Sequence, residues 1–122
     1  MAKKTPTLTR EGALAARPRP VRPVSATADE KGELRVTMEY ARPRWQRVLG
    51  AEERCRRTFV LDRLGREVYE YCDGARTVRD LVAGFADRHK VSVAEAEYSV
   101  THYLKTLAAK GLVVLEVERE TA

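Results

Sequence analysis

Few residues of this 122-residue chain have the types and the spacing that catalysis requires. The two histidines, His89 and His102, belong to no Ser-His-Asp arrangement, and no cluster of metal ligands or glycine-rich phosphate loop accompanies them. Asp73 precedes Gly74 at an expected helix end, where turn formation explains it without catalysis. We therefore expect a protein that is not an enzyme, uses no cofactor and holds no metal.

The two cysteines, Cys55 and Cys72, are far apart in the sequence and form no Cys-x-x-Cys pair. This spacing is typical of neither a disulfide framework nor a zinc site. Free thiols in a reducing compartment are the simpler interpretation, and they favour a cytoplasmic protein. No secretory signal is present, and no stretch approaches the roughly 20 apolar residues that span a bilayer, so we expect no membrane association.

The formal net charge of +5 lies in the N-terminal residues. Residues 1–23 carry six Lys or Arg and one Glu, so the residues after Pro23 sum to zero. Four prolines disfavour regular structure there, and a short helical turn at 11–16 has little to pack against. We expect 1–23 to be a basic, flexible tail, which is either merely solvated or an arm that contacts an acidic partner.

Three helices are predicted in the second half of the chain, because start and stop signals are present there. Asp62 stands at an N-cap position, and Thr77-Val-Arg-Asp80 and Ser92-Val-Ala-Glu95 are capping boxes. Asp73-Gly74 and Lys110-Gly111 end the first and third helices, since Gly accepts left-handed backbone. The apolar residues at helical spacing are Leu64, Val68, Tyr71 and Cys72, then Val78, Leu81, Val82 and Phe85, then Val93, Ala96, Val100, Tyr103, Leu104 and Leu107.

Strands are predicted before and after these helices. Val24–Ala28 is weakly strand-like, Asp29-Glu-Lys-Gly32 is typical of a turn, and Leu34–Tyr40 alternates apolar and polar residues. Thr58–Leu61 is a third strand, and Leu112–Val117 has the composition of a short C-terminal strand. The expected fold is α+β and winged helix-turn-helix-like, with a three-stranded antiparallel sheet followed by three helices.

The connection between the second and third strands is unusually long and basic. Pro43 breaks the preceding strand, and Trp45, Val48 and Leu49 have the spacing of a short amphipathic helical turn. An aromatic anchor beside arginines is typical of protein interfaces, which makes Trp45, Arg44 and Arg47 candidate partner contacts. The alternative interpretation is an elaborated connection whose Trp45 only covers the core.

The order of these elements resembles the PqqD-like family, the small proteins of pyrroloquinoline quinone biosynthesis and their relatives. The resemblance covers roughly Val24 to Leu115, and its most specific part is the Cys-Asp-Gly-x-x-Thr-Val segment that begins at Cys72. Residues 24–118 would then form one peptide-recognition domain, with 119–122 as a C-terminal tail. Compact members have a tight turn where this chain inserts a segment at about 41–56. The other matching residues are Leu61-Asp62, Gly65, Val68-Tyr69, Arg76-Thr77-Val78, Leu81-Val82, Leu104, Leu107 and Lys110-Gly-Leu112.

This resemblance implies a RiPP recognition element, which is a non-catalytic module that binds the leader of a ribosomally synthesised precursor peptide. In this family the peptide adds as a strand to the edge of the sheet, packs against the third helix, and is presented to a modifying enzyme, often a radical-SAM protein. Here the groove is expected between the third strand and the outward face of the third helix. The residues that would line it are Arg57, Thr58, Phe59, Val60 and Leu61, then Tyr98, Thr101, His102 and Lys105, with Ala94 and Glu97 nearby.

Two other functions compete with peptide binding. A winged-helix DNA-binding regulator would place the third helix in the major groove, yet the first half of that helix carries Glu95 and Glu97 and no cation. We therefore do not expect nucleic acid as the partner. A dimerising scaffold would instead use Trp45 and an open strand edge, and the sequence fits a monomer or a homodimer equally.

Overall fold

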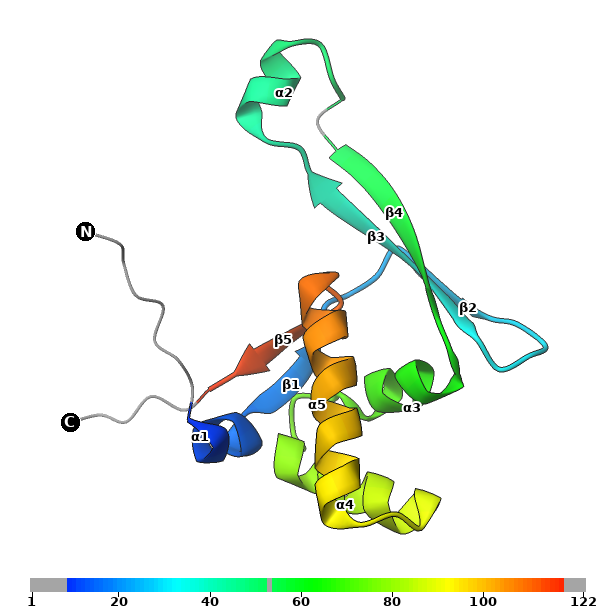
Figure 1. Ribbon diagram of the computed structural model, residues 1–122. Coiled ribbons are helices and arrows are strands. Elements are labelled where there is room, and N and C mark those ends of the chain that lie inside the picture. The colour runs from blue at the N-terminus through cyan, green and yellow to red at the C-terminus, as the bar shows by residue number, and fades with distance from the viewer. Residues whose placement is uncertain (1–8, 53, 118–122) are drawn as a thin grey trace. The chain divides into compact units, whose positions relative to one another are not determined.

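The computed structural model describes residues 9–52 and 54–117, which form two compact units. The hairpin unit comprises residues 21–67, and the helical unit comprises residues 9–20 together with 68–117. Helix α3 (Arg63–Tyr71) begins in the first unit and ends in the second. The expected α+β class, with a three-stranded antiparallel sheet and a short C-terminal strand, is confirmed (Figure 1).

The hairpin unit is built on an antiparallel sheet of order β2-β3-β4. Its strands are β2 (Ser25–Ala28), β3 (Leu34–Ala41) and β4 (Arg54–Leu61). Leu34, Val36 and Met38 are buried at alternate positions of β3, as a strand with one covered face requires. The β2–β3 turn contains Gly32 with φ of +85°, and the side-chain Nε of Arg63 at the start of α3 donates to the carbonyl of Lys31 at 3.2 Å.

Strand β4 begins four residues earlier than the sequence predicts, at Arg54 instead of Thr58. Its added half aligns with the end of β3, where Arg54 lies opposite Ala41 and Arg56 lies opposite Glu39. Four residues of the expected insertion at 41–56, Ala41 and residues 54–56, are therefore strand, and the described residues of the connection are 42–52. Helix α2 (Arg44–Val48) lies in this connection, at the end of the β3–β4 hairpin in Figure 1.

The helical unit packs α4 (Val78–His89) against α5 (Val93–Ala109). Buried side chains from both helices form its core, and they are the expected Val78, Leu81, Val82 and Phe85 with Ala96, Val100, Leu104 and Leu107. Val93 was expected among them but is 64% exposed, because it is the first residue of α5. Leu64, in the first turn of α3, is likewise exposed. No helix within the described ranges is both long and apolar enough to cross a membrane.

The predicted helix starts are confirmed by their hydrogen bonds. The Asp62 carboxylate accepts from the Gly65 amide at 2.7 Å, and Thr77 and Asp80 bond each other's backbone amides as a complete capping box. The Ser92 hydroxyl accepts from the Glu95 amide at 3.1 Å. Each bond satisfies a backbone donor that the first turn of a helix leaves without an intrahelical partner.

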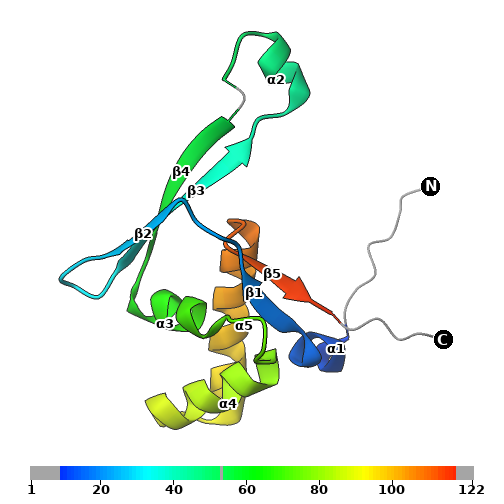
Figure 2. The same ribbon diagram turned by 180° about the vertical axis from the view of Figure 1, so that it is seen from behind.

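The prediction of a flexible N-terminal tail does not hold for residues 10–20. They form α1 (Arg10–Ala15) and β1 (Arg17–Pro20), and β1 pairs antiparallel with β5 (Val113–Glu116), beside which it lies in Figures 1 and 2. Leu14 and Ala16 are buried, and α1 packs on α4. The Ala16 carbonyl accepts from the Val78 amide at 2.9 Å. Residues 1–8 of the predicted N-terminal tail, residue 118 of the predicted domain and the predicted C-terminal tail 119–122 lie outside the described residues.

Prolines suit β1 because it needs donors on only one side. The Pro18 carbonyl accepts from the Gly74 amide at 2.8 Å, so the backbone of Pro18 faces away from β5. Backbone groups of alternate strand residues face the same side, and the absent N–H groups of Pro18 and Pro20 are therefore not missed in the pairing with β5.

Candidate functional site

Among the described strands, β4 pairs only with β3 and leaves its other backbone edge open. The Val24 amide donates to the Thr37 carbonyl at 2.8 Å, so Thr37 directs its backbone groups toward β2. Thr58 lies opposite Thr37, and its amide and carbonyl therefore face the open edge of β4. The hydroxyls of these two threonines lie 2.9 Å apart, as the closer side chains of a non-hydrogen-bonded pair allow.

The five expected strand residues differ in exposure. Arg57, Thr58 and Val60 are exposed, Phe59 is half-buried and Leu61 is buried. Leu61 lies opposite Leu34, another buried residue, and its side chain belongs to the core. The backbone of this segment remains the part with binding capacity, because an open strand edge presents a row of donors and acceptors.

The expected helix residues line one shallow hollow on α5. Tyr98, Thr101, His102 and Lys105 surround it together with Ala94 and Glu97. Tyr98 is 77% exposed, and its ring is stacked with that of His102 at a centroid distance of 6.5 Å. This face therefore offers flat aromatic surface beside the ammonium group of Lys105.

Glu97, at the rim of this hollow, already has a cationic partner. Arg10 of α1 donates to both carboxylate oxygens of Glu97, at 2.7 and 3.1 Å. The hydrogen bond to Glu97 raises the pKa of Arg10, so the guanidinium stays protonated. Arg10 was not predicted to contribute to this face, because it lies 87 positions from Glu97 and the residues between them carry no signal for the contact.

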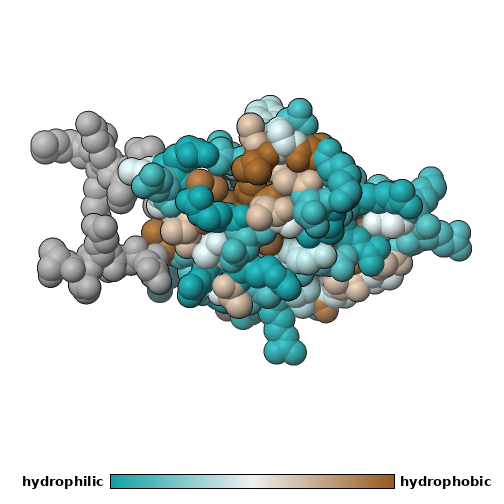
Figure 3. Space-filling view, turned by 90° about the horizontal axis from the view of Figure 1, so that it is seen from below, coloured by the Kyte–Doolittle hydropathy of each residue, from teal (hydrophilic) through white to brown (hydrophobic). Residues whose placement is uncertain are grey.

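The connection between β3 and β4 exposes an apolar cluster, which we call the hairpin tip and define as Trp45, Val48 and Leu49. These side chains are 62, 80 and 78% exposed, and α2 contains no buried residue. The interpretation that Trp45 covers the core is therefore wrong. Figure 3 shows a different face of the molecule, on which hydrophilic side chains predominate and apolar ones appear in patches.

Positive charge is concentrated on the β3–β4 hairpin. Residues 34–61 contain seven Arg and three Glu, a net charge of +4. The zero sum of residues 24–122 therefore includes a basic segment, and the long connection that the sequence shows to be basic belongs to it. Arg54 lies 3.8 Å from the Glu39 carboxylate, and both border a hollow with Arg42, Glu52, Cys55 and Arg56.

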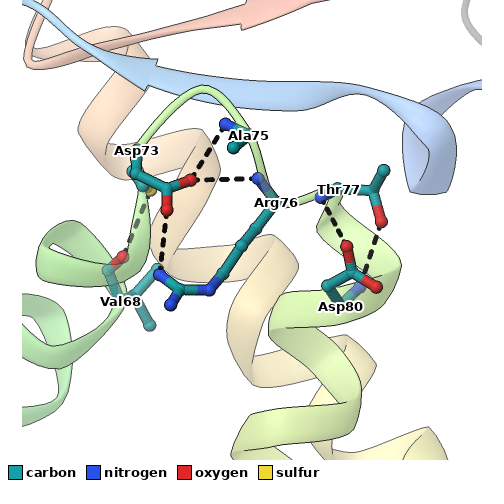
Figure 4. Close-up of polar contacts among 7 residues, drawn as sticks. Val68, Asp73, Ala75, Arg76, Thr77 and Asp80 are labelled. Carbon is teal, nitrogen blue, oxygen red and sulfur yellow. Dashed lines mark hydrogen bonds and ion pairs between the residues drawn. The ribbon is translucent and has the colours of Figure 1, made fainter.

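The polar contacts of the α3–α4 junction hold helix ends in place (Figure 4). Asp73 accepts from the amides of Arg76 and Ala75, and these bonds lower the pKa of its carboxyl. A hydrogen bond from the Thr77 amide lowers the pKa of Asp80 in the same way. Burial raises the pKa of Cys72 to about 12, and its thiol donates to the Val68 carbonyl.

Across residues 9–52 and 54–117, no three His, Cys, Asp or Glu side chains gather as metal ligands would.

Comparison with known proteins gives one family. The model of Coenzyme PQQ synthesis protein D (PqqD) matches residues 46–113, from within α2 to the first residue of β5. No curated protein and no solved structure matches the chain. The matched range includes β4, α3, α4 and α5, whereas β2 and β3 lie before it. Because this match covers more than half of the 122 residues, the chain belongs to the PqqD family.

Proposed function

We propose that this protein is a non-catalytic module that binds the leader of a ribosomally synthesised precursor peptide. The peptide adds as a strand to β4, and the module presents it to a modifying enzyme of the radical-SAM type. The open backbone edge of β4, within the part of the chain that matches the PqqD family, is the observation that carries this proposal. Strand addition obtains affinity from main-chain hydrogen bonds and selectivity from the neighbouring side chains.

The face of α5 supplies the second contact of the proposed complex. Tyr98 and His102 present stacked rings to an apolar leader side chain, and Lys105 meets a leader carboxylate. Thr101 lines the same hollow between them.

The hairpin tip is the proposed contact for the partner enzyme. Helix α2 has five residues and buries none of their side chains, so packing in the core of its unit does not stabilise it. Exposed Trp45 with Arg44 and Arg47 beside it has the composition of an interface hot spot. The enzyme would therefore dock at the end of the hairpin, while the peptide pairs along β4.

The test uses the neighbouring reading frames to obtain a leader peptide. A short precursor-like frame beside the gene supplies a synthetic leader, which is titrated into the 15N-labelled protein. We expect saturable binding, with chemical shift changes at residues 54–61 of β4 and at Tyr98, His102 and Lys105. Saturable binding without changes in β4 would contradict strand addition.

DNA binding is the second candidate function, and the charge of the hairpin favours it. Seven arginines in residues 34–61 are suited to contact phosphates. The acidic start of α5, with Glu95 and Glu97, opposes the use of that helix in the major groove. Salt-sensitive binding to duplex DNA, together with no response to the leader peptide, would replace the peptide proposal with this one.

A further inference from the structure

We infer that the peptide bound by β4 is acidic at alternate positions, with one carboxylate beside Arg54 and another beside Arg56. This inference rests on the proposed function and names the substrate class of the same strand edge. It depends on three observations within the hairpin unit: the length of β4, the face from which its arginines project, and the scarcity of acidic partners for them among the described residues.

The first observation is that the open edge extends well beyond the four residues the sequence predicts. Strand β4 is paired with β3 from Leu61 back to Arg54. Because the backbone of Thr58 faces the open edge, alternation places the backbone groups of Arg54, Arg56 and Val60 on that edge as well. An added strand can therefore bond to the arginine-bearing half of β4 and not only to Thr58–Leu61.

The second observation concerns the side chains. Arg54, Arg56, Thr58 and Val60 are at alternate positions and are all exposed, so they project from one face of β4. A strand added at the usual spacing of about 4.8 Å brings its own residues directly beside these four. The residues of the added peptide on this face would thus contact two guanidiniums, one hydroxyl and one apolar side chain.

The third observation is that β4 supplies no negative charge of its own. Its three charged side chains are those of Arg54, Arg56 and Arg57. Glu39, the one acidic residue of β3, lies opposite Arg56 in the register and forms an ion pair with Arg54 at 3.8 Å. Glu52 borders the same hollow. An acidic peptide on the open side would complete the charge pairs across the sheet.

These features define a pattern that does not depend on peptide direction. Carboxylates at positions i and i+2 fall beside Arg54 and Arg56 whether the added strand runs parallel or antiparallel to β4. Farther along the same face, the peptide places a hydroxyl or β-branched residue beside Thr58 and an apolar residue beside Val60. Cross-strand pairs of these kinds stabilise a sheet, whereas like charges directly opposite destabilise it.

A peptide satisfies this site better than a nucleic acid does. Both can place anions beside arginines, but only a peptide offers alternating amides and carbonyls to the open backbone of β4. A guanidinium also binds a carboxylate through two parallel hydrogen bonds. Duplex DNA is therefore included in the test as the competing ligand.

The probe is a displayed library of random 12-residue peptides, selected on the whole protein. We expect the selected sequences to be enriched in Asp or Glu at i and i+2. The Arg54→Glu/Arg56→Glu variant should lose this preference and select Lys or Arg at the same spacing. Arg22→Glu/Arg79→Glu is the matched control, since it reverses two exposed arginine charges that lie outside β3 and β4, and it should retain the acidic preference.

Affinity gives the quantitative test. A selected peptide in which both acidic residues are replaced by Gln should bind wild-type protein about tenfold more weakly, as two exposed cross-strand charge pairs allow. It should bind the Arg54→Glu/Arg56→Glu variant no more weakly than the acidic parent does. The advantage of the acidic peptide should shrink at high salt, because exposed charges are screened.

The outcomes separate this inference from the proposed function. Selected peptides that shift β4 resonances but show no acidic preference would overturn the inference and leave strand addition standing. A library and a leader that both fail to bind would overturn both proposals. Duplex DNA binding that the Arg54→Glu/Arg56→Glu variant loses, without any peptide binding, would assign the arginines to phosphate and overturn the inference.

Discussion

Two arginine-rich strands of this protein, β1 and β4, differ in how far their charges and backbone groups are paired. In β1, Arg19 forms an ion pair with Glu116 of β5 at 2.6 Å, and Pro18 receives a hydrogen bond from Gly74 on its other side. In β4, Arg54 lies 3.8 Å from its carboxylate partner, and one backbone edge has no partner strand within the described ranges. A basic strand is therefore not by itself a binding strand; what distinguishes β4 is the unused backbone and the unbalanced charge.

The prolines explain why β1 is unsuited to strand addition. Pro18 and Pro20 lack amide donors on the side that faces away from β5. A further strand on that side would find acceptors without donors. Strand β4 contains no proline, so every residue facing its open edge retains both groups.

The largest expected effect comes from placing a proline in β4, because prolines make β1 unsuited to strand addition. Thr58→Pro removes an amide that faces the open edge and keeps the pairing with β3. We expect leader binding to weaken at least tenfold, since one main-chain hydrogen bond is lost and the added strand clashes with the ring. Isothermal titration calorimetry with the leader peptide measures this loss.

Ala26→Pro is the matched control for this variant. Ala26 lies on β2, at the opposite edge of the same sheet, and by the same alternation its backbone faces away from β3. It should leave leader affinity unchanged. Equal losses in the two proline variants would mean that the sheet as a whole is disturbed, and strand addition to β4 would lose its support.

The second effect tests whether the N-terminal segment belongs to the core of the helical unit. Leu14→Ala removes a buried side chain of α1, and we expect it to lower the free energy of unfolding by about 2–4 kcal/mol. Urea denaturation followed by circular dichroism measures the change. Glu11→Ala, on the exposed face of the same helix, should change it by less than about 0.5 kcal/mol. Equal stability of the two variants would restore the tail interpretation.

Local signals explain which parts of this fold were predictable. The starts of α3, α4 and α5 are marked by Asp62, by Thr77 with Asp80 and by Ser92, and the side chains of Asp62, Thr77 and Ser92 each accept a backbone hydrogen bond there. Helical periodicity likewise placed Tyr98 and Lys105 on one face. These inferences succeed because the responsible contacts lie within one or two turns of the chain.

Contacts distant in sequence explain the failures. Arg17 lies opposite Glu116, nearly the whole chain away, and the proline-rich composition of β1 resembles a tail until its partner strand is known. The start of β4 has Arg54, Arg56 and Arg57 on both of its faces, which removes the alternation that marks a strand. The α5 side of the site followed from periodicity, but Arg10 reaches Glu97 only through the fold.

The third prediction concerns the hairpin tip. Trp45→Ala should weaken binding of the modifying enzyme encoded beside this gene by about tenfold or more, because truncating an exposed aromatic anchor removes a hot spot. The free energy of unfolding should not change, since α2 buries none of its residues. Val93→Ala, another exposed apolar truncation but in the helical unit, is the control. Unchanged enzyme binding with Trp45→Ala would remove the tip from the proposed interface.

The smallest effect distinguishes the two units by their thiols. Cys72 of the helical unit is buried, and burial raises its pKa to about 12 from the ordinary 9.0, whereas Cys55 of β4 is only half-buried. The folded protein therefore holds the Cys72 proton more tightly than the unfolded chain does. This contribution to stability is complete below about pH 9 and decreases as the pH rises toward 12. The difference in unfolding free energy between wild type and Cys72→Ala should consequently be smaller at pH 11 than at pH 8. Urea titrations at the two pH values measure it, and a difference independent of pH would show that the thiol ionises as readily in the folded protein as in the unfolded chain.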